Sequence, residues 1–233
     1  MSFAQQRLWF LNQLGRNQQE YLVPRVLRLR GVVDVGALES AFSGLVARHE
    51  VLRSRFVVGV GGEPVQVVDE PGVVRVSVVD LSVIGDVAVR EARLRGVVEA
   101  EAVRPFDLAV DALLRVCLVR VSAEDHVLVL AMHHIVADGW SIGVLSRELG
   151  ELYAAAVEGR GGVLPVLPVQ YADFAVWQRE WLRGGVLERQ LGYWRGRLAG
   201  VEPLELPTDF VRPAERSGRG ASLEFGVPAE VVA

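Results

Sequence analysis

The residues best suited to chemistry lie in one short stretch, His133-His134-Ile135-Val136-Ala137-Asp138-Gly139. Two of the four histidines of the chain fall here, beside a carboxylate and a glycine. A neutral imidazole accepts a proton near pH 7, so this stretch suits acid–base work on an amine or an alcohol. The Asp138 carboxylate would orient the imidazole or hold the loop by pairing with an arginine. Gly139 would let the backbone turn sharply and approach a substrate.

Two other interpretations of the stretch are weaker. Zinc needs three or four convergent ligands, whereas adjacent histidines at a strand end point in opposite directions. The only cysteine, Cys117, lies in a separate apolar run, so we expect no metal site. The second alternative is that both histidines merely end a strand and that Asp138 caps a helix. The concentration of polar groups favours a functional role over this alternative.

The segments on either side predict where these side chains are held. Residues 125–132 read as a buried strand because they are almost continuously apolar. The strand forms a hairpin with residues 112–121 across a short polar turn. A helical pattern runs from about Ser141 to Val157 and ends at Gly159. The histidines are therefore expected at a strand-to-helix junction, where a rigid strand presents an accessible loop.

The rest of the chain alternates helical and strand patterns. Asp34 is a good N-cap for a helix over residues 35–48. Mixed helices and hairpins predict an α/β sandwich in which helices cover one face of a largely antiparallel sheet. Further helices are expected at 3–14, 86–102, 171–183 and 186–199, and further strands at 22–29, 52–59, 64–69 and 73–79.

Composition limits the classes of protein to consider. The chain has 233 residues, of which 51% are hydrophobic and 23% are charged, as in globular proteins. A net charge of −4 argues against general nucleic-acid binding. No apolar run approaches the ~20 residues that cross a membrane, and the start lacks the pattern of a secretory signal. With a single cysteine, we expect a cytoplasmic protein without internal disulfides.

Several segments resemble, in the right order, the motifs of condensation domains of nonribosomal peptide synthetases. Residues 133–139 fit the HHxxxDG pattern, which also occurs across the chloramphenicol-acetyltransferase-like superfamily. Residues 48–56 resemble RHExLRTxF, with serine replacing the usual threonine. The other similar segments are 2–11 (SFAQQRLWFL), 104–108 (RPFDL), 171–178 (YADFAVWQ) and 206–213 (LPTDFVRP).

This resemblance implies the fold and the organisation of the chain. We expect a chloramphenicol-acetyltransferase-like two-layer sandwich, with a mixed, largely antiparallel sheet covered by helices. Residues 1–200 would be the N-terminal lobe, and 201–233 a linker and the start of the crossover into a C-terminal lobe that is missing. Such domains are acyltransferases that form a peptide bond between a donor aminoacyl or peptidyl thioester and the amine of an acceptor aminoacyl thioester. Both substrates are held on carrier domains, next to an adenylation domain. No cofactor would bind directly, since the substrates ride on phosphopantetheine arms.

The resemblance also assigns roles, with His133, His134, Asp138 and Gly139 as the candidate catalytic residues. His134 would act as a general base or position the attacking amine, and His133 would be structural. The Gly139 amide would donate a hydrogen bond near the tetrahedral intermediate. Asp138 would turn back from the cleft and pair with Arg48 or Arg53.

Other members of the superfamily give alternative functions. Residues 2–11 and the intact histidine motif look most like the class that takes an L-configured donor. The alternatives are a stand-alone acyltransferase using CoA or a carrier, and a non-catalytic lobe that only docks carrier domains. We expect the 233-residue chain to fold at least partly alone but not to form peptide bonds.

Overall fold

The computed structural model describes the chain except for residues 16–17, 212–213, 215–222, 224 and 232–233. Contacts divide the chain into two compact units, Met1–Leu191 and Gly192–Ala233. The sheet and the histidine motif belong to the first unit. The division falls earlier than the boundary expected after residue 200, and it cuts through one helix, α6 (Gly185–Leu198). The assignment of residues 1–200 to an N-terminal lobe stays a prediction.

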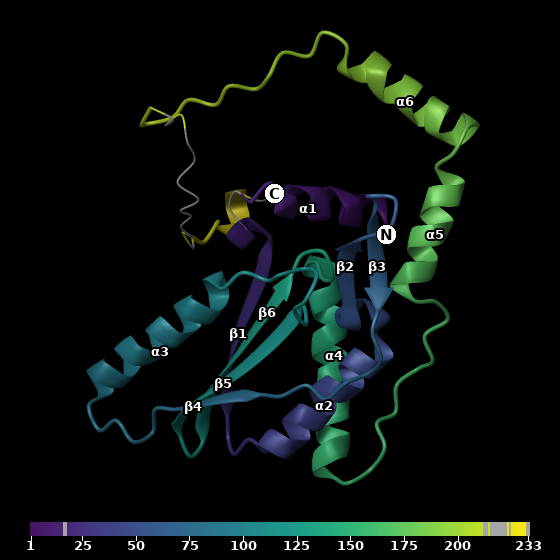
Figure 1. Ribbon diagram of the computed structural model, residues 1–233. Coiled ribbons are helices and arrows are strands. Elements are labelled where there is room, and N and C mark those ends of the chain that lie inside the picture. The colour runs from purple at the N-terminus through teal and green to yellow at the C-terminus, as the bar shows by residue number, and fades with distance from the viewer. Residues whose placement is uncertain (16–17, 212–213, 215–222, 224, 232–233) are drawn as a thin grey trace. The chain divides into compact units, whose positions relative to one another are not determined.

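The main sheet is built around the strand that ends in the motif. Its order is β1-β6-β5-β4, with antiparallel β1–β6 and β6–β5 pairs and a parallel β5–β4 pair. All residues of β6 after the first are buried, as the apolar sequence predicted. The predicted hairpin of β5 and β6 is confirmed (Figure 1). The strands are β1 (Leu22–Arg30), β4 (Ser77–Asp80), β5 (Leu114–Ser122) and β6 (Asp125–His133).

Helices lie on both faces of this sheet. Figure 1 shows it between α3 (Val87–Val103) and the pair α2 (Val35–Arg48) and α4 (Gly139–Val157). Leu128 and Leu130 of β6 pack in the core with α2 and α4, whereas Val127 and Val129 pack with α3. A strand that is apolar on both faces needs cover on both. The predicted fold class is confirmed, and α3 adds a covered face that the sequence interpretation lacked.

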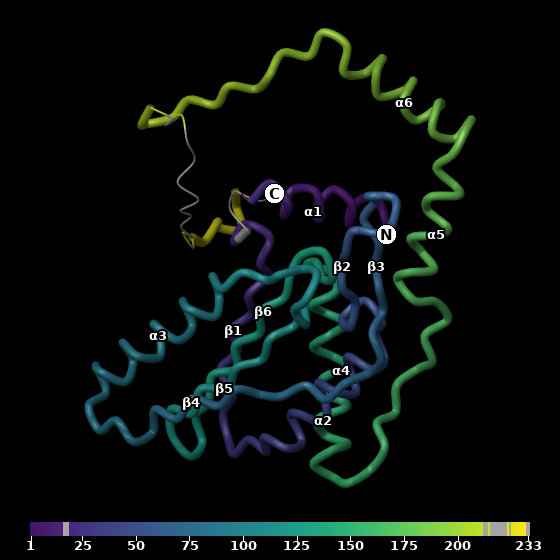
Figure 2. Tube along the Cα trace, in the orientation of Figure 1, coloured from purple at the N-terminus to yellow at the C-terminus, as the bar shows by residue number. Residues whose placement is uncertain are grey.

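The N-terminal helix α1 (Phe3–Gln13) is tied to α5 (Tyr171–Trp181), far along the chain (Figure 2). Ser2 caps α1 and forms a capping box with Gln5. From α5, Arg179 donates hydrogen bonds to the Met1 carbonyl at 2.6 Å and to the Gln6 side chain at 2.7 Å. The backbone N–H of Phe3 also donates to Gln178 Oε1 at 3.0 Å, so the two motif segments 2–11 and 171–178 lie together. Among the described residues, no helix is long and apolar enough to span a membrane.

Two predicted strands are shorter in the structure than expected. The strand predicted from residue 52 starts only at Ser54, because a 3₁₀ turn at Glu50–Arg53 precedes it. The strand predicted from residue 73 starts at Ser77. Before it, side chains of α2 take the backbone N–H groups, with Val74 donating to Ser43 Oγ at 2.9 Å and Val76 to Glu39 Oε1 at 3.0 Å. The remaining elements are η1 (Gln18–Tyr21), η2 (Glu50–Arg53), a two-stranded sheet of β2 (Ser54–Val58) and β3 (Pro64–Val68), and η3 (Ala229–Val231).

Candidate functional site

The motif loop joins β6 to α4, as the sequence predicted. His133 is the last residue of β6, and α4 begins at Gly139. The loop is fixed by distant segments. The backbone N–H of His134 donates to the Tyr21 carbonyl at 2.7 Å, and Gln5 Nε2 donates to the Ile135 carbonyl at 3.3 Å. Tyr21, the residue just before β1, and the buried Gln5 of α1 therefore fix the position of the loop.

The first histidine of the motif is an internal part of this loop. His133 is 1% exposed, and its Nδ1 accepts a hydrogen bond from the backbone N–H of Ile135 at 3.1 Å. Burial, followed by the charge of His134, lowers the pKa of His133 to about 4. The ring is therefore neutral at physiological pH, and its proton sits on Nε2 because Nδ1 accepts. These contacts fit a structural role.

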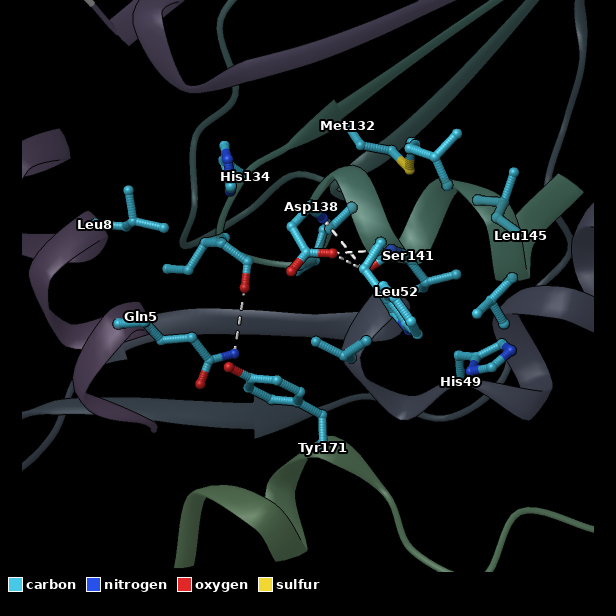
Figure 3. Close-up of a pocket in the computed structure, with 18 of the residues that line it drawn as sticks. Gln5, Leu8, His49, Leu52, Met132, His134, Asp138, Ser141, Leu145 and Tyr171 are labelled. Carbon is cyan, nitrogen blue, oxygen red and sulfur yellow. Dashed lines mark hydrogen bonds between the residues drawn. The ribbon is translucent and has the colours of Figure 1, made fainter. Parts of the chain in front are cut away.

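The second histidine has the opposite surroundings. The His134 side chain is exposed and makes no hydrogen bond with the described part of the chain. Its ring lines a pocket, shown in Figure 3. Successive residues at a strand end point to opposite sides, so the motif buries one imidazole and presents the next.

The pocket has a volume of about 430 Å³, which lies within the ~300–1,000 Å³ typical of ligand sites. Its walls come from α1, the end of α2, the motif loop, the first turns of α4 and residues 167–171. Most of the lining is apolar. The polar side chains that line it include Gln170 and the four labelled in Figure 3 as His134, Asp138, His49 and Tyr171.

Asp138 caps α4, and the ion pair predicted for it is wrong. Its Oδ1 accepts hydrogen bonds from the Ser141 backbone N–H at 2.8 Å and from Ser141 Oγ at 2.6 Å. These two bonds, against a smaller effect of burial, lower the pKa of Asp138. The carboxylate is exposed and lines the pocket rather than turning away from it. In the described structure, neither Arg48 nor Arg53 pairs with it.

The two arginines are held by other partners. Arg48 Nε donates to Glu148 Oε2 at 3.1 Å, and Arg53 donates to the Asp69 carbonyl and lies 3.5 Å from Glu50 Oε1. Glu148 sits on the core-facing side of α4 and is 6% exposed. A carboxylate so buried requires charged or hydrogen-bonding partners. Arg48 therefore pairs with Glu148 and not with the exposed Asp138.

Glu148 also binds a histidine that the sequence interpretation did not single out. His49 Nε2 lies 2.6 Å from Glu148 Oε2, and its ring lines the pocket. Burial acts to raise the pKa of Glu148, but hydrogen bonds from His49 and Arg48 outweigh it, so the pKa is lowered. The signal available in the sequence was an acidic residue within the apolar stripe of a predicted helix.

The backbone conformation at position 139 does not require a glycine. It is the first residue of α4, it does not have the positive φ that favours glycine, and a Cβ there would meet nothing within 4 Å. The sharp turn predicted for it is therefore not present. Its remaining functional feature is a backbone N–H at a helix N-terminus, where the first N–H groups have no partner within the helix.

Other groups with catalytic or ligand chemistry are few. The described residues contain no cluster of three or more His, Cys, Asp or Glu side chains able to hold a metal ion. Cys117 is buried in β5, and burial raises the pKa of its thiol, which makes it unreactive. The motif loop and its pocket are the best candidate site in this part of the chain.

Comparison with known proteins decides the family. Residues 1–233 match the condensation-domain family. The chain belongs to this family. The condensation-domain chain is 48% identical over 229 residues to one of the linear gramicidin synthase proteins of Brevibacillus parabrevis, covering 97% of this chain and 4% of that protein. It is 44% identical over 232 residues to cyclosporin synthetase simA of Tolypocladium inflatum, covering 99% of this chain and 2% of the synthetase.

Solved structures agree with the fold. The X-domain in complex with OxyB from teicoplanin biosynthesis matches 92% of this chain with a TM-score of 0.80 and 32% identity. The first condensation domain of the calcium-dependent antibiotic synthetase matches 88% with a TM-score of 0.75; at 24% identity this likeness concerns the fold alone. The chain spans 46% and 49% of these two solved chains, and only a few per cent of the two synthetases.

Proposed function

We propose that this condensation-domain chain provides the histidine wall of a site that forms peptide bonds in a nonribosomal peptide synthetase. The observation that carries the proposal is the ring of His134. It is exposed and has no hydrogen bond within the described chain, yet its backbone is fixed beside an apolar pocket. A side chain left unpartnered at a fixed position is available for substrate.

The reaction is an acyl transfer between two thioester-bound substrates. The amine nitrogen of the acceptor attacks the carbonyl carbon of the donor thioester. A C–N bond forms, the C–S bond breaks, and the proton lost by the amine ends on the departing thiol. His134 accepts a hydrogen bond from the attacking amine and receives its proton as the C–N bond forms. The N–H of Gly139 donates to the oxyanion of the tetrahedral intermediate.

The partners of this reaction follow from the family. Donor and acceptor carrier domains bring the substrates on phosphopantetheine arms, with an adenylation domain nearby and an L-configured donor residue. A second lobe completes the site, a view supported by solved relatives that are about twice as long as the chain. Since alignment supplies most of the rate, the 233-residue chain alone forms no peptide bond. The cytoplasmic location stays a prediction.

The test uses a condensation domain whose N-terminal half is this chain, mixed with loaded donor and acceptor carrier domains. Mass spectrometry then measures the dipeptide on the acceptor carrier. His134→Ala lowers its rate of formation by about 10²–10⁴-fold, the usual contribution of a general base. Glu151→Ala, at an ion pair on the outer part of α4, serves as the control. Equal rates for His134→Ala and the control would refute the proposal. A CoA-bound donor in place of the carrier tests the stand-alone acyltransferase alternative.

A second function has a specific observation in its favour. The X-domain of this fold was solved in complex with another protein, OxyB, and is 32% identical to this chain. A lobe that docks a protein without performing chemistry is therefore a concrete alternative. It predicts that carrier domains bind the complete condensation domain whose N-terminal half is this chain, and that the loaded pair gives no product above background there, with or without His134→Ala.

A further inference from the structure

One buried glutamine binds both the start of the first helix and the motif loop. Gln5 lies in the first turn of α1 and is 1% exposed. Its Oε1 accepts a hydrogen bond from the Ser2 backbone N–H at 3.0 Å, and its Nε2 donates to the Ile135 carbonyl at 3.3 Å, the dashed line beside Gln5 in Figure 3. The two bonds fix the orientation of the amide. Reversing it would set a donor against the Ser2 N–H and an acceptor against the Ile135 carbonyl.

Only one of these two bonds belongs to the helix cap. In a capping box, the third helical residue accepts from the N–H of the cap residue, and glutamate does this as well as glutamine. The cap therefore makes no use of the Nε2 donor of Gln5. Packing alone would favour an apolar side chain here, since a buried polar group costs free energy unless it is hydrogen-bonded. The Ile135 carbonyl is what requires a donor, and hence glutamine, at position 5.

The bond from Gln5 helps to hold the backbone of His134 from both sides. Before the ring, the His134 N–H donates to the Tyr21 carbonyl at 2.7 Å. After it, Gln5 holds the carbonyl of Ile135. The His134 ring makes no hydrogen bond with the described chain, so its place beside the pocket depends on this backbone. A displacement of about 1 Å at a reacting group can cost about 100-fold in rate.

We propose that Gln5 is a positioning residue for His134. The proposal rests on the proposed peptide-bond-forming function, in which the His134 ring meets the attacking amine. Without the Nε2 donor, the Ile135 carbonyl is released, the loop shifts and the ring leaves its place at the amine. A substitution of Gln5 therefore acts on kcat more than on KM, and it acts only while His134 is present.

The experiment uses the complete condensation domain whose N-terminal half is this chain, with loaded carrier domains. Gln5→Glu keeps an oxygen for the cap but sets a carboxylate against the Ile135 carbonyl. At pH 8 it lowers kcat about 100-fold, while KM for the donor carrier stays within about twofold. Burial raises the pKa of a carboxyl group. As the pH falls from 8 to 6, the carboxyl takes up a proton, its O–H donates to Ile135, and the rate relative to the unaltered domain recovers. The control is Gln6→Glu, which keeps the acceptor for Arg179 and shows no such pH dependence.

A second variant keeps the test valid if Gln5→Glu fails to fold. Gln5→Met fills the same space without charge or donor, and it lowers kcat at least about tenfold, with no recovery in acid. Added to His134→Ala, it changes the residual rate by less than about twofold, because it acts through His134. An equal fall with and without His134, or a rate for Gln5→Met equal to that of Gln6→Glu, overturns the positioning role. Absence of product from the unaltered domain overturns instead the proposed function on which the role rests.

Discussion

Two regions that line one pocket, the loop after β6 and the end of α2, use histidine in opposite ways. In the loop, His134 is exposed and its ring has no hydrogen bond within the described chain. At the end of α2, the ring of His49 is bound at 2.6 Å to a buried carboxylate. The second region uses the imidazole to join α2 to α4, whereas the first leaves it for a substrate. Residue type alone therefore does not mark the reactive group.

Helix α4 connects the two regions. Asp138 caps its first turn next to the motif loop, and Glu148 lies ten residues further along, about 15 Å at 1.5 Å per residue. Arg48 and His49 bind Glu148 and so fix the position of α4 against α2. We infer that the contacts of Glu148 with Arg48 and His49, here called the frame, hold α4 in the position from which the motif loop presents His134. Loss of the frame should lower the stability of the fold, whereas loss of His134 should lower the rate of the reaction.

The largest effect is expected where the histidine is free. His134→Ala should lower the rate of condensation by about 10²–10⁴-fold. The free energy of unfolding should change by less than about 0.5 kcal/mol, because an exposed side chain without partners contributes little to stability. Parallel rate and urea-unfolding measurements check this dissociation. A loss of stability above about 2 kcal/mol would instead place His134 in the frame.

The frame should fail when its carboxylate is removed. Glu148→Ala removes the carboxylate that binds both Arg48 and His49, although Arg48 keeps its hydrogen bond to the Pro165 carbonyl, and should lower the free energy of unfolding by about 3 kcal/mol. Glu151→Ala, on the same helix, breaks a more exposed pair with Arg160 and should cost less than about 1 kcal/mol. Urea unfolding of both variants makes the comparison. Similar losses would show that burial of Glu148 adds nothing.

These two regions also show how far the sequence reaches. Helix α2 was predicted with its observed limits, since Asp34 and the spacing of apolar residues are local signals. The junction at His134 was predicted because an apolar strand and a helical pattern meet there. The partner of Arg48 was not, because Glu148 lies 100 residues away and meets it only when α2 packs on α4. Sequence patterns describe elements well, but the choice among distant partners depends on packing.

The third prediction contrasts the two adjacent histidines of the motif through pH. The pKa of His133 is about 4 in the folded protein, against 6.5 for an ordinary histidine. The unfolded chain therefore takes up a proton at higher pH than the folded protein does. The free energy of unfolding should fall as the pH drops from 6.5 to 4, by up to about 3 kcal/mol.

Unfolding curves over this pH range test the contrast. His133→Asn keeps an acceptor near the Ile135 N–H but cannot titrate, so it should flatten this part of the fall. His134→Ala, the matched variant one residue away, should reduce the fall only in part, because burial, and not the charge of His134, is the larger cause of the lowered pKa of His133. The same fall in His133→Asn would mean that another group causes it.

Asp138 tests a smaller feature of the loop. Asp138→Ala removes the cap of α4 and should cost about 1 kcal/mol of stability. Asp138→Ser keeps an oxygen that can accept from the Ser141 N–H, so it should retain most of that stability. A loss of about 3–5 kcal/mol in Asp138→Ala, as for a broken buried ion pair, would instead support the predicted ion pair between Asp138 and an arginine.

The smallest effect is expected at Gly139. A substitution there tells whether the position needs glycine for its backbone conformation or for close contact with the substrate. A Cβ at Gly139 meets nothing within 4 Å, whereas one at Gly36, in the first turn of α2, would lie 3.3 Å from the cap oxygen of Asp34. Gly139→Ala should therefore change the free energy of unfolding by less than about 0.5 kcal/mol, and Gly36→Ala should be the less favourable of the two. Since alanine keeps the backbone N–H, the rate of condensation should also stay within about threefold. A tenfold fall in rate with unchanged stability would mean that the substrate itself occupies the space beside Gly139. The substrate would then lie against the motif loop, on the His134 side of the pocket.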